Sequence, residues 1–281
     1  MTKIAVISDI HGNQTAFEAV IDDIKSENVS ETWFLGDLFL PGPAGNDLIP
    51  LLEEINTTVL LRGNWDDVLL KIVDHPDQYN SDDPSDVYMG LLSKYLSEKL
   101  NDQYISIIRG APIQTNKTIH HLNFTLSHNE KANNGGPKLV PTSPTDNFEP
   151  LFENESVDVA IYAHTHHQLF RYTQNDQLIL NPGSIGEPFF KHASLNKDRR
   201  AQYTILDIDD TGIKDIHFKK VAYDIKAEIL KSEQEALPYI DLYDRLLNQG
   251  ISPTQDKELL QSVNEANEFK EMFQDILNAL K

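Results

Sequence analysis

The chain has 281 residues, of which 40 % are hydrophobic and 24 % are charged, so its composition is that of a folded globular protein. Its formal net charge of −20 excludes the basic surface that binding to duplex nucleic acid or an anionic membrane requires. The absence of cysteine excludes disulfides, thiolate metal ligands and cysteine nucleophiles. No run of about 18 consecutive apolar residues occurs and MTKIAVISDIHG lacks a signal-peptide pattern, so we expect a cytoplasmic protein.

The first sixty residues alternate between strand-like and helix-like segments. Strands are predicted over 3–8, 32–35 and 57–61, and helices over 15–27 and 47–55. This order predicts a layered α/β fold whose first sheet begins as a parallel one. In such sheets, functional loops gather at the carboxyl ends of the strands.

The rest of the chain is predicted to contain a helical insertion, further strands and a C-terminal helical region. We expect a domain over 1–221 with a helical cap inserted at about 66–110, followed by a helical extension over 222–281 packed on that domain. Further strands are predicted near 119–126, 157–163, 168–173, 178–180, 202–207 and 213–219, with a long loop at 129–147. Apolar residues between Leu259 and Leu280 recur at the spacing of one last helix. Its apolar face would either pack on the domain or form a homodimer interface.

Five short polar signals follow the apolar strand segments. They are Asp9-Ile10-His11, Gly36-Asp37, Gly63-Asn64, Ser127-His128 and His164-Thr165-His166. Taken singly, Asp9 could be a helix N-cap, Asp37 or Asn64 a turn residue and His128 a buried imidazole. Five such signals in order at strand ends instead predict one shared site.

The residue types in these signals suit a pair of divalent metal ions. Carboxylate, amide oxygen and imidazole are ligands for manganese, iron, zinc, cobalt or nickel. Asp37 suits a bridging position, since its charge offsets the repulsion between two cations about 3.5–4 Å apart. Two such cations can activate a water molecule between them and hold a phosphate in line for attack. Metal ions would also attract phosphate to this strongly acidic chain.

The ordered motifs D-x-H, G-D, G-N, H and [G/A]-H-x-H resemble those of the calcineurin-like metallophosphoesterase superfamily, in its bacterial phosphodiesterase branch. The resemblance covers about residues 3–220, and Asn181-Pro182-Gly183-Ser184 matches a loop common in that branch. It implies a four-layer α/β/β/α sandwich with two metal ions, manganese or iron being favoured over zinc, nickel or cobalt. It also implies two ligand sets, one of Asp9, His11, Asp37 and His166 and the other of Asp37, Asn64, His128 and His164.

The sequence departs from the related phosphomonoesterases at Trp65, where those enzymes carry a histidine that protonates the leaving group. Without a proton donor, an alkoxide leaving group would lose about 10²–10⁴-fold in rate. A nucleotide phosphate, with a last pKa near ~6, hardly needs the proton. Trp65 therefore favours diester or phosphoanhydride hydrolysis, and its ring could stack on a nucleobase or cover the cleft floor. Arg62 is expected to contact phosphate, as in related phosphatases, whereas no role is predicted for Asp66.

The helical insertion, the C-terminal helices, Gly63-Asn64-Trp65-Asp66 and the NPGSIGEPFF segment (181–190) resemble Gram-positive phosphodiesterases that hydrolyse diadenosine tetraphosphate asymmetrically. That resemblance implies a nucleotide or phosphodiester substrate, attack by a hydroxide between the metals, and ATP and AMP as products. Two alternatives stay open. One is a phosphomonoesterase or protein phosphatase, and the other is a non-catalytic scaffold of the same fold, which would be expected to lose metal ligands.

Overall fold

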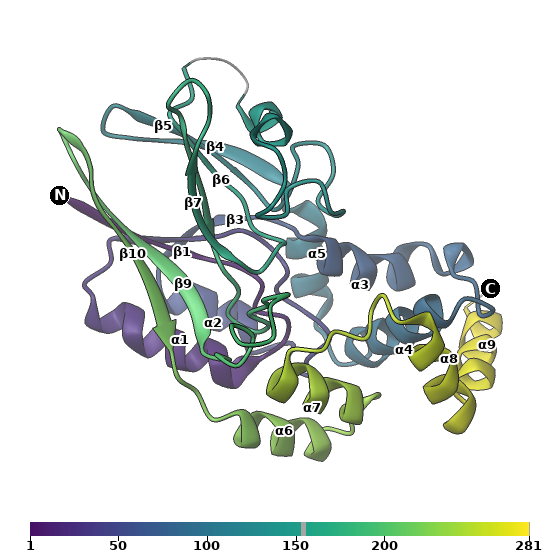
Figure 1. The fold of residues 1–281 in the computed structure, drawn as a ribbon. Coiled ribbons are helices and arrows are strands. Elements are labelled where there is room, and N and C mark those ends of the chain that lie inside the picture. The colour runs from purple at the N-terminus through teal and green to yellow at the C-terminus, as the bar shows by residue number, and fades with distance from the viewer. Residues whose placement is uncertain (153–155, 281) are drawn as a thin grey trace.

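Two mixed sheets of five strands each form the centre of the computed structural model, which describes residues 1–152 and 156–280 (Figure 1). The first sheet, in the order β10-β9-β1-β2-β3, consists of β1 (Thr2–Ile7), β2 (Glu31–Phe34), β3 (Thr57–Leu60), β9 (Ala201–Asp209) and β10 (Gly212–Val221). The second, in the order β4-β5-β6-β8-β7, consists of β4 (Gln114–Ile119), β5 (Leu122–Ser127), β6 (Val159–Ile161), β7 (Gln168–Tyr172) and β8 (Leu178–Pro182). Strands β1, β2 and β3 run parallel to one another in the first sheet, as do β5, β6 and β8 in the second.

Both faces of the central strands are buried, because side chains alternate across a sheet. In β1, Ile4 and Val6 join the core between the two sheets, whereas Ala5 and Ile7 face the helices. Strand β8 alternates in the same way, with Leu178 and Leu180 in the inter-sheet core. The apolar runs of these strands therefore reflect burial on both sides.

Helices cover the outer face of the first sheet, and a loop-rich segment covers that of the second. The helices before the second sheet are α1 (Gln14–Ser26), α2 (Leu48–Glu54), α3 (Asn64–Asp74), α4 (Pro84–Ser97) and α5 (Asp102–Gly110). On the second sheet, Phe148 and Leu151, which lie in or beside two short 3₁₀ turns, pack against Tyr162 and Ile179. The predicted α/β sandwich is confirmed, although the described part of its fourth layer contains these short turns in place of longer helices.

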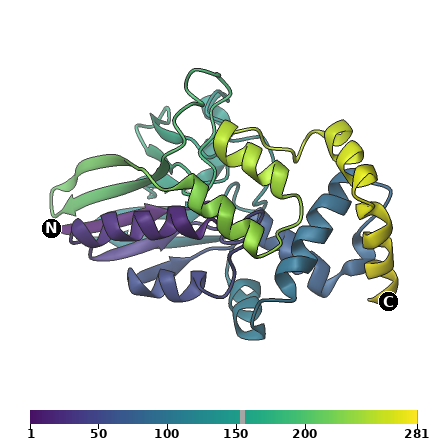
Figure 2. The same cartoon turned by 90° about the horizontal axis from the view of Figure 1, so that it is seen from below.

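The C-terminal region consists of four helices, namely α6 (Ile225–Gln234), α7 (Ile240–Gln249), α8 (Lys257–Ala266) and α9 (Phe269–Ala279). Helix α6 lies along α1, whereas α8 and α9 pack against α4 (Figure 2). The prediction of one helix between Leu259 and Leu280 was wrong, because the chain turns at Glu268, whose φ of 57° is left-handed. The buried Phe273 fits above Gly90, where an added Cβ would lie 2.1 Å from its ring.

Two further strand predictions can be compared with the structure. The strand expected near 119–126 is one arm of a hairpin, in which β4 and β5 pair on either side of His120 and His121. The strands expected near 202–207 and 213–219 are confirmed as β9 and β10, which pair antiparallel. Within the described residues, no helix is long and apolar enough to cross a membrane.

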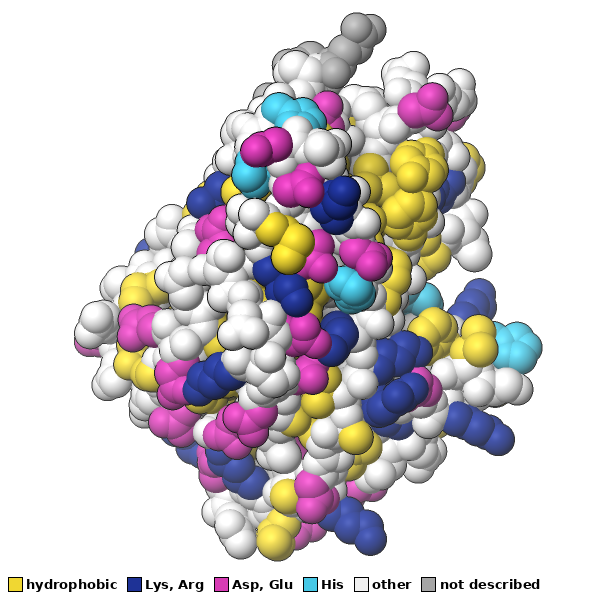
Figure 3. All heavy atoms as spheres, turned by 90° about the vertical axis from the view of Figure 1, so that its left-hand side faces the viewer, with side chains coloured by type: hydrophobic (Ala, Val, Ile, Leu, Met, Phe, Trp, Pro, Cys, Tyr) yellow, Lys and Arg dark blue, Asp and Glu magenta, His cyan; other side chains and the backbone are white. Residues whose placement is uncertain are grey.

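The face of the molecule away from α8 and α9 carries acidic and basic side chains side by side (Figure 3). Hydrophobic side chains gather in one region of this face (Figure 3). Exposed aromatic residues of the edge strands β7 and β10 include Phe170, Tyr172 and Phe218.

Candidate metal centre

All five polar signals lie where strands end, and the topology brings them together. Asp9 and His11 follow β1, Asp37 follows β2, and Asn64 begins α3 after β3. His128 follows β5, while His164 and His166 follow β6. Because β1–β3 are parallel in one sheet and β5 and β6 in the other, their carboxyl ends meet at the same edge of the sandwich.

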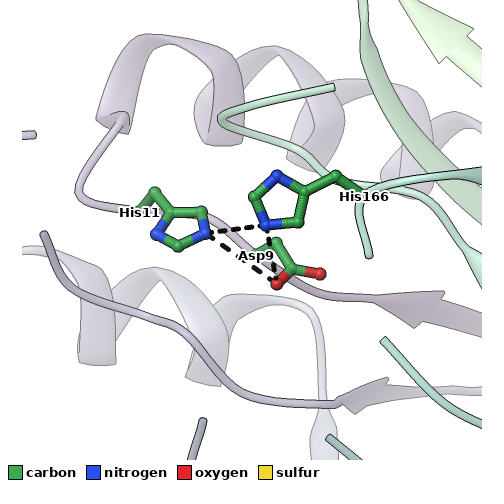
Figure 4. Close-up of side chains that lie close together, drawn as sticks. All are labelled: Asp9, His11 and His166. Atoms are coloured by element: carbon green, nitrogen blue, oxygen red, sulfur yellow. Dashed lines mark hydrogen bonds and ion pairs between the residues drawn. The ribbon is translucent and has the colours of Figure 1, made fainter. Parts of the chain in front are cut away.

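The side chains form two clusters that share Asp37 as their neighbour. In the first, Nε2 of His166 lies 3.3 Å from Oδ1 of Asp9 and 3.1 Å from Nε2 of His11 (Figure 4). In the second, Nε2 of His128 lies 3.4 Å from Oδ2 of Asp37. Oδ2 of Asp37 is also 3.7 Å from Nε2 of His11, so this carboxylate faces both clusters.

His164 and Asn64 complete the second cluster. One ligand atom each from Asp37, His128 and His164 lies within 4.8 Å of the others, and the same holds for Asp9, His11 and His166. Oδ1 of Asn64 is 3.1 Å from Nε2 of His128. The structure therefore gathers all seven residues that the motifs predicted.

Hydrogen bonds to the main chain orient the four imidazoles. Each ring can donate one N–H to a carbonyl, the pairs being His11 Nδ1 with Leu40, His128 Nδ1 with Leu35, His166 Nδ1 with Glu187 and His164 Nε2 with Gly136. This leaves the other ring nitrogen with its lone pair available to a metal ion. The distances for these four bonds range from 2.6 to 3.1 Å.

Three buried carboxylate oxygens in the clusters lack hydrogen-bond partners. They are both oxygens of Asp9 and Oδ2 of Asp37, of which Asp9 Oδ1 and Asp37 Oδ2 have an imidazole Nε2 nearby, at 3.3 and 3.4 Å. An unpaired carboxylate oxygen buried away from water is costly unless a cation balances it. The unpaired oxygens and the inward-facing imidazole nitrogens thus fit a dinuclear site for divalent cations.

The charges of the clusters shift the pKa values of their members. Burial alone would lower the pKa of His128 and of His166, but the neighbouring Asp37 and Asp9 raise each to about 9. Burial would raise the pKa of Asp9 and Asp37, yet the adjacent histidines outweigh it and leave both lowered. Burial, together with the charge on His128, lowers the pKa of His164 to about 4.

No role was predicted for Asp66, and the structure supplies one. Its buried carboxylate accepts hydrogen bonds from the main-chain N–H groups of Asp37, Leu38 and Gly63, at 3.0, 3.1 and 2.9 Å. It thereby ties the loop that carries Asp37 to the first turn of α3, which begins at Asn64. The position of Asp66 at the third residue of a helix is the sequence signal for this capping role. Burial, reinforced by the nearby Asp37, raises the pKa of Asp66 to about 7.

The loop of Asn181-Pro182-Gly183-Ser184 holds the other ligand segments in place. Oγ of Ser184 and the N–H of Gly186 donate to the carbonyl of Asp9, at 2.9 Å each. The amide of Asn181 donates to the carbonyl of Ala163, the residue before His164. The loop thus fixes the first and last ligand motifs relative to each other.

Of the two residues predicted to contact substrate, Trp65 lines the cleft and Arg62 does not. Arg62 forms an ion pair with Asp67 at 2.7 Å and donates to the carbonyl of Arg109, and it is absent from the described residues that line the cleft. Its contact with phosphate stays a prediction. Trp65 does line the cleft, with its ring edge-on to that of His11 at 6.2 Å. Stacking on a nucleobase also stays a prediction.

The cleft over the clusters has a volume of about 240 Å³ and includes residues for which no individual role was predicted. Besides Asp37, Asn64, Trp65, His164 and His166, its lining includes Glu187, Phe189 and Arg199, together with Ser252, Thr254 and Gln255. The last three come from the connection between α7 and α8. No periodicity or motif places that connection beside the metal ligands, because it reaches them only through the packing of the C-terminal helices.

Comparison with known proteins agrees with this geometry. A family model described as the calcineurin-like phosphoesterase superfamily domain matches residues 2–211. The chain is 27 % identical over 252 residues to an uncharacterized protein of Methanocaldococcus jannaschii, covering 84 % of this chain and 94 % of that one.

Two crystal structures share the fold. A hypothetical protein of Pyrococcus horikoshii OT3 superimposes with a TM-score of 0.71 at 22 % identity, covering 90 % of this chain and 100 % of that one. A metallophosphoesterase of Sphaerobacter thermophilus gives 0.68 at 20 % identity, covering 89 % and 100 %. With its two His/Asp clusters, the chain is a metal-dependent phosphoesterase that belongs to the calcineurin-like phosphoesterase superfamily.

Proposed function

We propose that the protein is a dinuclear phosphodiesterase and phosphoanhydride hydrolase that cleaves diadenosine tetraphosphate asymmetrically into ATP and AMP. One metal ion would be held by Asp9, His11, Asp37 and His166, and the other by Asp37, Asn64, His128 and His164. The unpaired oxygens of Asp9 and Asp37 support this assignment of ligands. When bound, the two cations would supply Lewis-acid stabilisation of phosphate and an activated water.

The observation that carries the choice of reaction is the position of Trp65. Its indole lines the cleft next to Asn64, where a phosphomonoesterase needs an acid for an alkoxide leaving group. An indole N–H donates hydrogen bonds but cannot release a proton at neutral pH. A nucleoside polyphosphate leaves without that proton, so the cleft suits cleavage of an anhydride or of an activated diester.

The chain's own residues would position the substrate and hold the ligands. Asp66 and Ser184 keep the segments of Asp37 and Asp9 in place through main-chain hydrogen bonds. Leu35, Leu40, Gly136 and Glu187 hold the histidine tautomers through their carbonyls. Trp65 offers an aromatic surface on which a base can stack, worth about 1–3 kcal/mol per base.

The reaction is tested with purified, manganese-loaded protein. We expect turnover of bis(p-nitrophenyl) phosphate and of diadenosine tetraphosphate, with ATP and AMP separated by chromatography. Two molecules of ADP per substrate would instead show symmetric cleavage. Turnover limited to phosphomonoesters would contradict the proposed reaction, and metal content far below stoichiometric after chelator-free purification would favour a scaffold.

Replacing Asp37 with Asn should abolish turnover while leaving the fold intact, because Asp37 faces both clusters and supplies the shared negative charge. Steady-state kinetics and circular dichroism measure the two effects. Glu233→Ala, which removes one exposed acidic residue of α6, is the control for loss of charge. Retained turnover in Asp37→Asn would remove this residue from the mechanism.

A further inference from the structure

Glu187 is a buried acidic residue in the metal cleft that the proposed reaction does not use. Glu187 is one of the residues that line the cleft, and it is only 8 % exposed. Both of its main-chain polar groups have hydrogen-bond partners, because its N–H donates to Oγ of Ser184 and its carbonyl accepts from His166. Its carboxylate oxygen Oε1, however, is buried without a hydrogen-bond partner. Such a group needs a partner that the free protein does not provide.

The neighbouring cation does not satisfy this oxygen. Arg199 also lines the cleft, but its guanidinium donates to the carbonyls of Leu246, Leu247 and Pro188 and to Oδ1 of Asn196. These four bonds leave one of its five N–H groups uncommitted. Arg199 therefore joins the end of α7 to the loop after β8. With most of its N–H groups used in this way, its guanidinium is not available to bind a further phosphate group of the substrate.

The metal clusters do not include Glu187 either. Among the described residues, the two groups that could hold an ion consist of Asp9, His11 and His166, and of Asp37, His128 and His164. A carboxylate beside these groups repels a further anion but accepts hydrogen bonds from a neutral donor. A hydroxyl or amine of the bound molecule would supply such a donor.

The remaining lining of the cleft indicates the kind of molecule. Trp65 and Phe189 present aromatic rings, and Ser252, Thr254 and Gln255 of the α7–α8 connection present neutral polar groups. An aromatic surface can stack on a base, and a carboxylate that accepts from ribose hydroxyls is a recurrent device in nucleotide sites. A nucleoside attached to the reacting phosphate meets both requirements.

We propose that Glu187 is a specificity-determining residue that accepts a hydrogen bond from the ribose hydroxyls of the nucleoside next to the phosphate being cleaved. This inference rests on the proposed function and narrows its substrate class to ribonucleotide esters and anhydrides. The connection between α7 and α8 lines the same cleft, so the C-terminal helices would take part in substrate selection.

The test compares substrates that share one scissile bond. Manganese-loaded wild type, Glu187→Ala and Glu187→Gln are assayed with the p-nitrophenyl ester of adenosine 5′-phosphate and with its 2′,3′-dideoxy analogue. Bis(p-nitrophenyl) phosphate serves as a substrate without hydroxyls, and Glu233→Ala, an exposed residue of α6, is the charge-matched control. We expect Glu187→Ala to lose about 10- to 100-fold in kcat/KM on the ribose substrate, mainly through KM.

On the dideoxy substrate and on bis(p-nitrophenyl) phosphate, Glu187→Ala should retain wild-type activity within about twofold, and Glu187→Gln should be intermediate on the ribose substrate. Equal losses on all three substrates, or a lost limb of the pH–rate profile, would show a structural or proton-transfer role and overturn the inference. Unchanged activity on all three would also overturn it. Thermal unfolding monitors whether each variant is folded.

A failure of the proposed function can be distinguished from a failure of the inference about Glu187. A manganese-loaded wild type that hydrolyses none of these substrates would overturn that function. In that case, calorimetric binding of AMP and of 2′,3′-dideoxy-AMP to the loaded protein provides the same comparison. A preference of wild type for AMP that disappears in Glu187→Ala would support the inference, and equal affinities would reject it.

Discussion

At the scale of single residues, the predicted metal ligands adopt an unusual backbone conformation. Asp9, His11, Asp37, His164 and His166 all have φ between 54° and 63°. This left-handed region is unfavourable for residues with a Cβ, so the surrounding structure must impose it. The N–H of Asp9 donates to the carbonyl of Gly36, and the N–H of His11 to that of Asp37. Such bonds connect ligand segments that lie far apart in the sequence.

Asp66 stabilises one of these segments, and Asp66→Asn tests its role. An amide in place of the carboxylate would set an NH₂ group against main-chain N–H donors, so we expect a loss of about 1–3 kcal/mol in the free energy of unfolding. The displacement of Asp37 should also weaken manganese binding. Chemical denaturation and metal titration measure both effects, with the exposed Asp77→Asn as control. Wild-type metal affinity in Asp66→Asn would contradict this role.

The raised pKa values of His128 and His166 predict that metal binding depends on pH. In the metal-free protein, both rings gain stability from the carboxylates while protonated, so this contribution is complete below pH 6.5 and is lost as pH rises through about 9. A metal ion needs the deprotonated rings and must displace these protons. The stabilisation by added manganese should therefore be larger at about pH 8.5 than at about pH 6.

Thermal unfolding with and without chelator measures this stabilisation, and calorimetry in buffers of different ionisation enthalpy counts the protons released. Release of protons that decreases as pH rises through about 9 is the expected result. The same shift in melting temperature at both pH values, without proton release, would show that these histidines are not ligands.

At the scale of secondary-structure elements, a buried aromatic residue of α9 packs against the insertion helices. Phe273 is fully buried, and its ring is 5.5 Å from that of Tyr79 in an edge-on arrangement. We expect Phe273→Ala to lower the free energy of unfolding by about 3–5 kcal/mol through the cavity it leaves. Urea denaturation measures this, with the half-exposed Met272→Ala as a matched control. A change similar to that of the control would show that α9 is not docked on α4.

Helix α6 is joined to α1 by a buried carboxylate. Glu228 accepts from the N–H and the hydroxyl of Thr15, at 3.1 and 2.5 Å, and Oη of Tyr243 in α7 lies 3.3 Å away. Burial raises the pKa of Glu228 above its usual 4.5. The folded state therefore favours the protonated form, and this contribution to stability is lost as pH rises through the raised pKa.

Replacing Glu228 with Gln removes this titration while keeping the shape of the side chain. We expect wild type to lose stability relative to Glu228→Gln as pH rises from about 5 to about 8. Urea denaturation of both proteins across this range measures the difference, and Glu233→Gln, exposed on the same helix, controls for the loss of charge. A difference independent of pH, or one that grows in favour of wild type with pH, would contradict the assignment.

At the scale of the whole molecule, a chain of net charge −20 keeps its phosphate chemistry at one edge of a two-sheet sandwich. The elements that meet there come from both sheets and from the α7–α8 connection. The division into a domain over 1–221 and an extension over 222–281 stays a prediction, and so does a homodimer. The packing of α6 on α1 and of α8 on α4 explains how the last sixty residues reach the cleft.

Much of the site could be predicted from the sequence because its signals are local. An apolar run predicts a strand, and the polar residue after it marks the strand's end, as at Asp9, Asp37 and His128. Parallel strands then gather those ends at one edge without further information. The same local reasoning failed between Leu259 and Leu280, where apolar spacing continues through a turn that a left-handed residue makes at Glu268.

The amino-acid sequence by itself determined the α/β class, the order of the motifs and the residues that gather at the metal centre. Only the tertiary structure decided that Asp66 holds the Asp37 loop, that Arg62 pairs with Asp67, and that Glu187 and the α7–α8 connection line the cleft. The reason is physical. Periodicity and turn chemistry act over a few residues, whereas burial, hydrogen-bond partners and left-handed strain depend on segments brought together from distant parts of the chain.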